Sequence, residues 1–277
     1  MNASKISGTL FEQLNFRAER QKVISSNIAT VNTPDYKTKE LVFDDELNLA
    51  MKNSLQMNQT NRMHMNNIDI NQMRIDMKEG DAIRDAGLVA PESILAKKDI
   101  SYGEFGISNL LDVYYPKETV GKLPTIVNIH GGGFFYGDKE LYQFYCMSLA
   151  ERGFCVVNFN YRLAPEYLFP SPLEDTNNVL LWMLANVDNY PFDLTNLFLV
   201  GDSAGAQLTE QYATISSNPD YAQLFSFKAA PVTFNAIGVN CGVYFLGQEE
   251  SAKNAFPYYF DEQDTDSLSK LFPVESF

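Results

Sequence analysis

Residues 197–205 decide the fold of this 277-residue chain; they read Leu197-Phe198-Leu199-Val200-Gly201-Asp202-Ser203-Ala204-Gly205. The four apolar residues predict a buried strand, and the glycines on either side of Ser203 allow a sharp turn from that strand into a helix. Such a turn lifts the serine hydroxyl out of the backbone and directs the Ala204 amide towards the reacting carbon. Asp202 is expected to form hydrogen bonds around the turn. The stretch therefore predicts a nucleophilic serine between a strand and a helix.

A glycine triplet lies upstream of the serine, directly after another apolar run. The run is residues 125–129, and it is followed by His130, Gly131, Gly132 and Gly133. The amides of Gly132, Gly133 and Ala204 are candidates for an oxyanion hole, which holds the negative oxygen that forms when the serine attacks an acyl carbon. His130 is expected to brace the glycine turn through the nearby backbone. An activated hydroxyl and fixed amide donors are the two groups that acyl transfer needs.

Residues 77–277 resemble the hormone-sensitive-lipase-like branch of the α/β-hydrolases. Besides the two glycine motifs, the resemblance rests on the segment between them, which contains Tyr161-Arg162-Leu163-Ala164-Pro165-Glu166, Phe169-Pro170 and Leu173-Glu174-Asp175. It implies an α/β three-layer sandwich and a carboxylic-ester hydrolase that forms an acyl-serine on small or medium acyl substrates, without metal or cofactor. The implied nucleophile is Ser203, the implied oxyanion hole is Gly132, Gly133 and Ala204, and the supporting motif residues are His130, Gly131, Gly201, Asp202 and Gly205.

The sequence lacks a recognisable base for the serine. The resembling branch places an acid and then a histidine after the serine, whereas both histidines here, His64 and His130, precede it. No later carboxylate follows an apolar strand, and residues 261–266 form an acidic stretch typical of a solvated surface. We therefore expect a hydrolase domain truncated at its C-terminus, without triad acid or histidine. Its ester hydrolysis should be marginal at most, because loss of the histidine costs another serine hydrolase about a million-fold in turnover.

The composition changes near residue 77. Residues 1–77 hold seven of the nine methionines but one of the sixteen glycines. An apolar stripe from Leu10 to Val31 predicts an N-terminal helical extension that ends at Pro34 and has no core of its own. Residues 25–37, together with residues 17–22 and 43–47, resemble the N-terminal signature of bacterial flagellar rod and hook proteins, most closely the proximal basal-body rod protein. The expected domains are a rod-protein-like segment at 1–70 and a partial hydrolase at 77–277, joined between Asn66 and Met77.

Two functions of different class stay open at this point. One is hydrolysis of a small-molecule ester, with a cytoplasmic location. The other is structural: a component or fragment of the flagellar basal-body rod, in which residues 1–70 would contact other rod subunits. A gene rearrangement and a sequence-assembly error would both produce such a chain.

The net charge and the cysteine content restrict the classes of binding partner that we expect. The net charge of −14 argues against nucleic acids and anionic membrane surfaces. No apolar stretch reaches transmembrane length, and the start lacks a hydrophobic signal region. Cys146, Cys155 and Cys241 have no metal-binding spacing and suit reduced thiols. Cys155 and Cys241 lie in apolar runs, so we expect both to be buried.

The apolar patterns predict the following elements. Strands are expected at residues 112–115, 125–129, 154–160, 197–200 and 238–245, and helices at 141–152, 175–185 and 204–216. The last strand is expected to form an open sheet edge, which favours low solubility or self-association.

Overall fold

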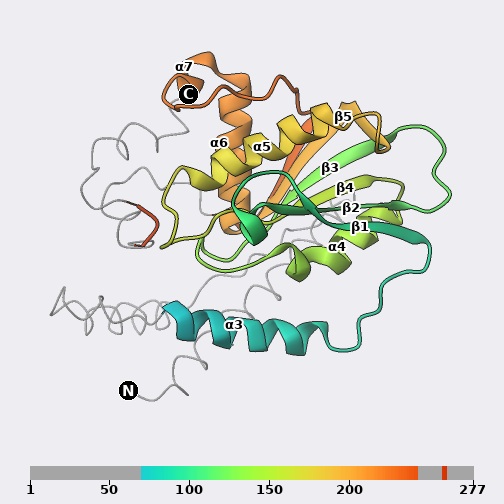
Figure 1. Ribbon diagram of the computed structural model, residues 1–277, viewed down its shortest axis with the longest axis horizontal. Coiled ribbons are helices and arrows are strands. Elements are labelled where there is room, and N and C mark those ends of the chain that lie inside the picture. The colour runs from blue at the N-terminus through green and yellow to red at the C-terminus, as the bar shows by residue number, and fades with distance from the viewer. Residues whose placement is uncertain (1–69, 243–257, 261–277) are drawn as a thin grey trace, which may run out of the picture. The chain divides into compact units, whose positions relative to one another are not determined.

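The computed structural model describes residues 70–242 and 258–260, which build a single mixed sheet with helices on both sides (Figure 1). The predicted rod-protein-like helix lies outside these residues. The strands are β1 (Ile94–Ser101), β2 (Leu110–Pro116), β3 (Leu123–Ile129), β4 (Cys155–Phe159), β5 (Phe192–Asp202) and β6 (Ala236–Asn240). The helices are α3 (Ile70–Asp85), α4 (Gln143–Ala150), α5 (Ser171–Ala185), α6 (Ala204–Ser217) and α7 (Pro219–Ala222), with short 3-10 helices η2 (Gly106–Asn109) and η3 (Lys139–Tyr142).

The strand order is β1-β2-β4-β3-β5-β6. β1 pairs with β2 and β2 with β4 in antiparallel fashion, whereas β4, β3, β5 and β6 run parallel to their neighbours. Parallel neighbours require crossover connections, which α4, α5 and α6 provide. Because the carboxyl ends of parallel strands meet at one edge, the residues that follow β3 and β5 come together. Ile129 of β3 is indeed the register partner of Gly201 of β5.

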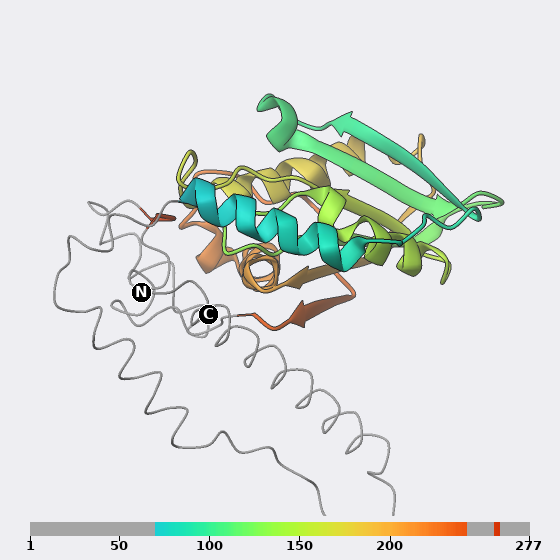
Figure 2. The same cartoon turned by 90° about the horizontal axis from the view of Figure 1, so that it is seen from below.

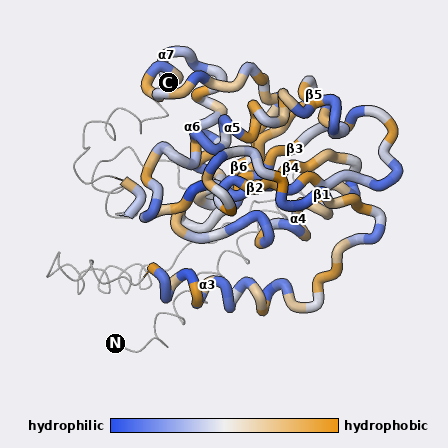
Figure 3. The backbone as a smooth tube through the Cα atoms, in the orientation of Figure 1, coloured by the Kyte–Doolittle hydropathy of each residue, from blue (hydrophilic) through white to orange (hydrophobic). Residues whose placement is uncertain are grey.

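The sheet separates two apolar layers. On one face, Val127, Ile129 and Leu199 pack with residues of α5 and α6 such as Leu180 and Tyr212. On the other face, the alternate strand residues pack with Cys146, Met147 and Ala150 of α4. Side chains of successive strand residues point to opposite faces, so the continuous apolar runs of β3, β4 and β5 supply both layers. The apolar colour of these central strands is visible in Figure 3. The result is the three-layer α/β-hydrolase sandwich that the sequence predicts.

Most of the predicted elements are confirmed, and several bounds change. The strands expected at 112–115, 125–129 and 197–200 are longer in the structure, and the helix expected at 175–185 begins at Ser171, where Pro172 suits a first turn. The helix expected at 141–152 is split into η3 and the shorter α4. The strand at β1 was not predicted, because its sequence carries two lysines and an aspartate among its eight residues.

The last predicted strand and one cysteine require correction. β6 begins two residues earlier than expected and ends at Asn240, so the predicted strand at 238–245 was wrong at residues 241 and 242; residues 243–245 lie outside the described part. Cys241 is exposed rather than buried, because it follows the strand and turns the backbone with a φ of 51°. Cys155 is buried in β4, as predicted.

Helix α3 lies on the α4 side of the sheet (Figures 1 and 2). It begins at Ile70, and none of its residues is buried. Across residues 70–242 and 258–260, every helix is too short or too polar to span a lipid bilayer.

Candidate active site

Ser203 occupies a strained position between β5 and α6. Its φ and ψ are 52° and −114°, values that a non-glycine residue rarely adopts. Its amide donates to the Asn240 carbonyl at 2.8 Å, which fastens the turn to the end of β6. Gly205, the second residue of α6, packs directly on the end of β3: a Cβ there would lie 2.1 Å from the Ile129 oxygen. The backbone around Ser203 therefore has the tight form that the glycine-flanked sequence predicts.

The glycine triplet folds into a second tight turn after β3. Gly132 has a φ of +121°, and a Cβ there would lie 2.0 Å from the Tyr136 carbonyl oxygen, so only glycine fits. The Gly132 oxygen accepts hydrogen bonds from the amides of Phe135 and Tyr136, at 3.2 and 2.9 Å. Within the described residues, the amides of Gly132, Gly133 and Ala204 donate no hydrogen bond. Three amide donors are thus available at the start of α6 and in this turn.

The two glycine motifs are in contact. A Cβ on Gly131 would lie 2.8 Å from the Asp202 carbonyl oxygen, and one on Gly205 would lie 2.5 Å from the His130 oxygen. The Tyr142 hydroxyl joins the motifs: it donates to Asp202 Oδ2 at 2.7 Å and accepts from the Gly131 amide at 3.3 Å. The bonding partner of the Asp202 side chain is thus a tyrosine that the sequence did not point to.

The Tyr142→Phe variant is expected to lower the free energy of unfolding by about 1–3 kcal/mol, because it leaves a carboxylate oxygen and an amide without their partner. Tyr145→Phe is the matched control on the next turn, since the Tyr145 hydroxyl makes no hydrogen bond in the described residues. Urea unfolding of both variants measures the difference. Equal midpoints would mean that the bridge contributes nothing.

His130 is fully buried beside the glycine turn. Its Nδ1–H donates to the Gly131 carbonyl at 2.7 Å, and its ring stacks on Tyr161 with centroids 4.1 Å apart. Its Nε2 has no hydrogen-bond partner in the described part of the chain. Burial lowers its pKa to about 4, against the weaker opposing effect of the Gly131 bond. The buried imidazole is thus bonded to its own loop, and no hydrogen bond joins it to Ser203 in the described residues.

This buried imidazole predicts acid sensitivity. The unfolded chain takes up a proton at His130 near pH 6.5, whereas the folded chain takes it up only near pH 4. Acidification through that window therefore favours unfolding, by about 3 kcal/mol in total. In His130→Asn, the loss of unfolding free energy between pH 6.5 and 4 should be smaller by that amount. The same pH dependence in variant and parent would contradict the assignment.

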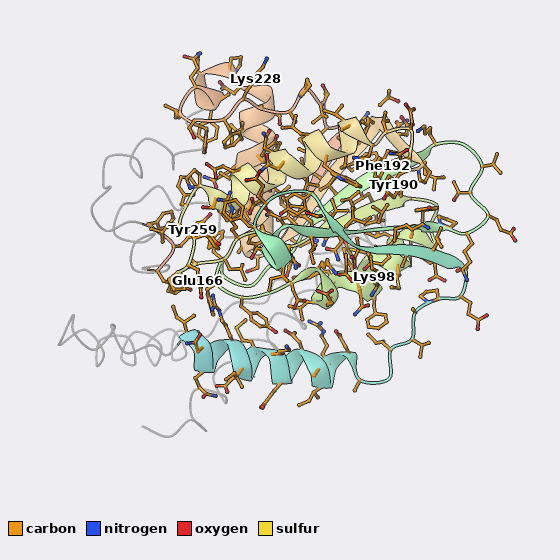
Figure 4. The ribbon with its side chains drawn as sticks, in the orientation of Figure 1. Lys98, Glu166, Tyr190, Phe192, Lys228 and Tyr259 are labelled. Carbon is orange, nitrogen blue, oxygen red and sulfur yellow. The ribbon has the colours of Figure 1, made fainter. Side chains whose placement is uncertain are left out.

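Residues 161–175, which lie between the two glycine motifs, support the glycine turn through hydrogen bonds. The Tyr161 hydroxyl donates to the His130 carbonyl at 3.0 Å, and the Ala164 amide donates to the Phe134 carbonyl at 2.9 Å. Arg162 Nε donates to both oxygens of the buried Asp175 carboxylate at 3.0 Å. Tyr259, labelled in Figure 4, stacks on Phe134 with ring centroids 4.1 Å apart. The distinctive residues at 161–175 thus hold the turn in place.

A buried lysine anchors the chain that leaves the glycine turn. The Lys139 side chain is 1% exposed, and its Nζ lies 3.0 Å from the fully buried Asp112 and 2.8 Å from Asp99. Sequence reasoning missed this pair, because the two residues belong to different elements and share no motif. Asp112 also accepts from the Tyr114 hydroxyl at 2.7 Å, so the buried carboxylate is well bonded.

The described residues hold neither a second histidine nor a group of three or more His, Cys, Asp or Glu side chains that could bind a metal ion. What they bring together is the serine turn, three amides and His130. This arrangement can present a nucleophile and hold an oxyanion.

Comparison with known proteins agrees with this geometry. The model of the BD-FAE family matches residues 111–261. Probable carboxylesterase 6 of Arabidopsis thaliana is 40% identical over 111 residues, which are 38% of this chain and 33% of that protein. The probable carboxylic ester hydrolase LipM of Mycobacterium tuberculosis is 32% identical over 149 residues, or 53% of this chain and 34% of LipM. The chain thus spans about a third of the length of these curated relatives.

Solved esterases share the fold. Esterase B from Lactobacillus rhamnosis, in a complex with a tributyrin phosphonate, superposes with a TM-score of 0.65 at 28% identity, over 71% of this chain and 64% of that one. An esterase from Pyrobaculum calidifontis has the same fold, with a TM-score of 0.56 at 23% identity over 79% of this chain and 72% of its own. The family match includes both glycine motifs and covers more than half of the residues, so the chain belongs to the BD-FAE family of α/β-hydrolases.

Proposed function

We propose that this protein is a carboxylic-ester hydrolase that forms an acyl intermediate on Ser203. The observation that carries the proposal is the positive φ of Ser203 at the start of α6, beside a glycine turn whose Gly132 and Gly133 amides donate no hydrogen bond to the described residues. The serine oxygen would attack the acyl carbon, and the amides of Gly132, Gly133 and Ala204 would stabilise the oxygen that becomes negative. The backbone of the two turns would be held in this form by the supporting motif residues, which are His130, Gly131, Gly201, Asp202 and Gly205.

The proposed substrate is a small-molecule ester with a short or medium acyl chain. Aromatic side chains lie beside the glycine turn: the Tyr258 hydroxyl is 3.8 Å from the position of a Cβ on Gly133, and its ring meets the Phe135 ring at 5.0 Å. Aromatic rings at this position would suit an acyl chain better than a charged group. The relatives named as carboxylesterases, and the esterase bound to a tributyrin phosphonate, support the same class.

We also propose that these 277 residues perform the reaction slowly. Serine attack requires a base that accepts the hydroxyl proton. His130 is buried and bonded to Gly131, His64 precedes the serine, and no histidine follows Ser203 in this sequence. The amides can therefore stabilise the oxyanion while the proton transfer lacks its usual partner.

The test is labelling of the purified chain by an alkyl fluorophosphonate, followed by intact-protein mass spectrometry, with Ser203→Ala as the control. We expect a slow, single adduct that is absent from the control. Labelling as rapid as that of a complete esterase would show that another group activates the serine. An identical adduct on Ser203→Ala would refute Ser203 as the nucleophile.

A second proposal concerns residues 1–70, which carry the sequence resemblance to the flagellar rod protein. We infer that this segment can bind flagellar rod subunits, and that without such binding the protein stays in the cytoplasm. Co-sedimentation of the chain with isolated flagellar basal bodies, compared with a variant lacking residues 1–66, tests this. Equal recovery of both proteins would contradict it.

A further inference from the structure

Arg74 of α3 fastens two backbone segments at the glycine turn. Its Nε donates to the Phe135 carbonyl at 2.7 Å, and its Nη2 donates to the Ala164 carbonyl at 2.7 Å. The remaining guanidinium hydrogens reach both oxygens of Glu166, each at 2.8 Å. Figure 4 labels Glu166, which lies close to the beginning of α3. One side chain thus links the helix, the glycine turn and the segment that braces the turn.

The Phe135 carbonyl belongs to the turn that presents the proposed oxyanion hole. Phe135 and Tyr136 close this turn by donating their amides to the Gly132 oxygen. Fixing the Phe135 carbonyl therefore limits rotation of the peptide groups on which the direction of the Gly132 and Gly133 amides depends. Helix α3 makes a second contact with this turn: the Tyr136 hydroxyl donates to Asp81 Oδ2 at 2.6 Å.

Apolar burial does not explain why α3 lies here. None of its residues is buried, and Ile75 and Ile83 are 51% and 78% exposed. The helix is instead held by the polar contacts of Arg74 and Asp81, with a further bond from Arg84 to the Leu141 carbonyl. Glu166 is 54% exposed, so the ion pair itself contributes little. The bonds to the two backbone carbonyls are the part of this contact that bears on the turn.

We infer that Arg74 is a positioning residue for the oxyanion hole, and that α3 serves to hold the glycine turn in its reactive shape. This inference rests on the proposed function of that turn. Arg74 does not touch the substrate; it acts through the Phe135 carbonyl. A displacement of the donors by about 1 Å can cost a hundredfold in rate. Loss of Arg74 should therefore slow the step in which Ser203 forms its covalent bond.

The experiment compares fluorophosphonate labelling of Ser203 in the parent, Arg74→Ala, Glu166→Ala and Lys78→Ala. Lys78 is an exposed cation on the same helix, and no hydrogen bond to it occurs in the described residues. We expect Arg74→Ala to lower the first-order labelling constant by about 10- to 100-fold with an unchanged half-saturating probe concentration, because oxyanion donors act mainly in the transition state. The Glu166→Ala and Lys78→Ala rates should stay within about threefold of the parent.

Added guanidinium separates positioning from simple destabilisation. At concentrations well below those that unfold proteins, it should restore part of the Arg74→Ala rate and leave Lys78→Ala unchanged, whereas sodium chloride of equal ionic strength should do neither. An Arg74→Ala rate equal to that of the parent, or a loss that only follows a lower melting temperature and is not rescued, would overturn the inference alone. Absence of any Ser203-dependent adduct in the parent would overturn the proposed function, and the inference with it.

Discussion

Purified protein of these 277 residues is expected to turn over p-nitrophenyl butyrate about a million-fold more slowly than a serine esterase with a complete triad. The proposed reaction needs amide donors for the oxyanion and also a base for the serine proton. The turns at Ser203 and Gly132 supply the proposed nucleophile and amide donors, whereas His130, the one histidine among residues 70–242 and 258–260, is buried and donates its Nδ1–H to the Gly131 carbonyl. Oxyanion donors and binding alone retain only a small part of the acceleration of a serine hydrolase.

Steady-state release of p-nitrophenolate measures this turnover. Ser203→Ala sets the background, and esterase B from Lactobacillus rhamnosis provides the active comparison. We expect a rate close to the background, with a small part that depends on Ser203. Turnover within about a hundredfold of the active enzyme, abolished by Ser203→Ala, would mean that another residue of the chain deprotonates the serine.

Gly205→Ala is expected to destabilise the protein strongly. The added Cβ would lie 2.1 Å from the Ile129 oxygen and 2.5 Å from the His130 oxygen, and both are backbone atoms at the end of a central strand. Neither can move without disturbing the β3–β5 pairing, so the free energy of unfolding should fall by about 3 kcal/mol or more.

Gly80→Ala is the matched control for this substitution. Gly80 lies inside α3, and a Cβ there would meet no atom within 4 Å. The same chemical change should therefore be neutral or stabilise the protein by up to about 1 kcal/mol, because alanine favours a helix over glycine. Urea unfolding of both variants makes the comparison. A Gly205→Ala protein as stable as the parent would show that the backbone at the end of β3 can shift to accommodate the added methyl group.

The fold was accessible from the sequence because its determinants are local. The apolar runs of β3, β4 and β5 predict buried strands, and the glycines around Ser203 predict the turn between β5 and α6. β1 escaped prediction because, as an edge strand, it carries Lys97, Lys98 and Asp99, which obscure the apolar alternation. The bound of β6 and the exposure of Cys241 were misjudged because apolar residues alone do not fix where pairing with β5 ends.

The side chains that hold the site in place could not be predicted from the sequence, for a different reason. Tyr142, Lys139 and Arg74 act on residues that are distant along the chain, through hydrogen bonds and ion pairs to carboxylates or backbone carbonyls. No spacing rule predicts such a contact, because it depends on how separate elements pack. Sequence reasoning therefore identified the candidate groups of the reaction and missed the side chains that hold them. The rod-like segment at residues 1–70 lies outside the described residues except for Ile70, and it stays a prediction.

In the proposed reaction, Ser203 attacks an acyl carbon beside amides that stabilise the oxyanion. The most direct measurement is peptide mass spectrometry of the protein after long incubation with p-nitrophenyl acetate. We predict a mass increase of one acetyl group on the peptide that contains Ser203, and its absence from Ser203→Ala. Acetylation confined to lysines, or equal in parent and variant, would show that Ser203 is not the nucleophile.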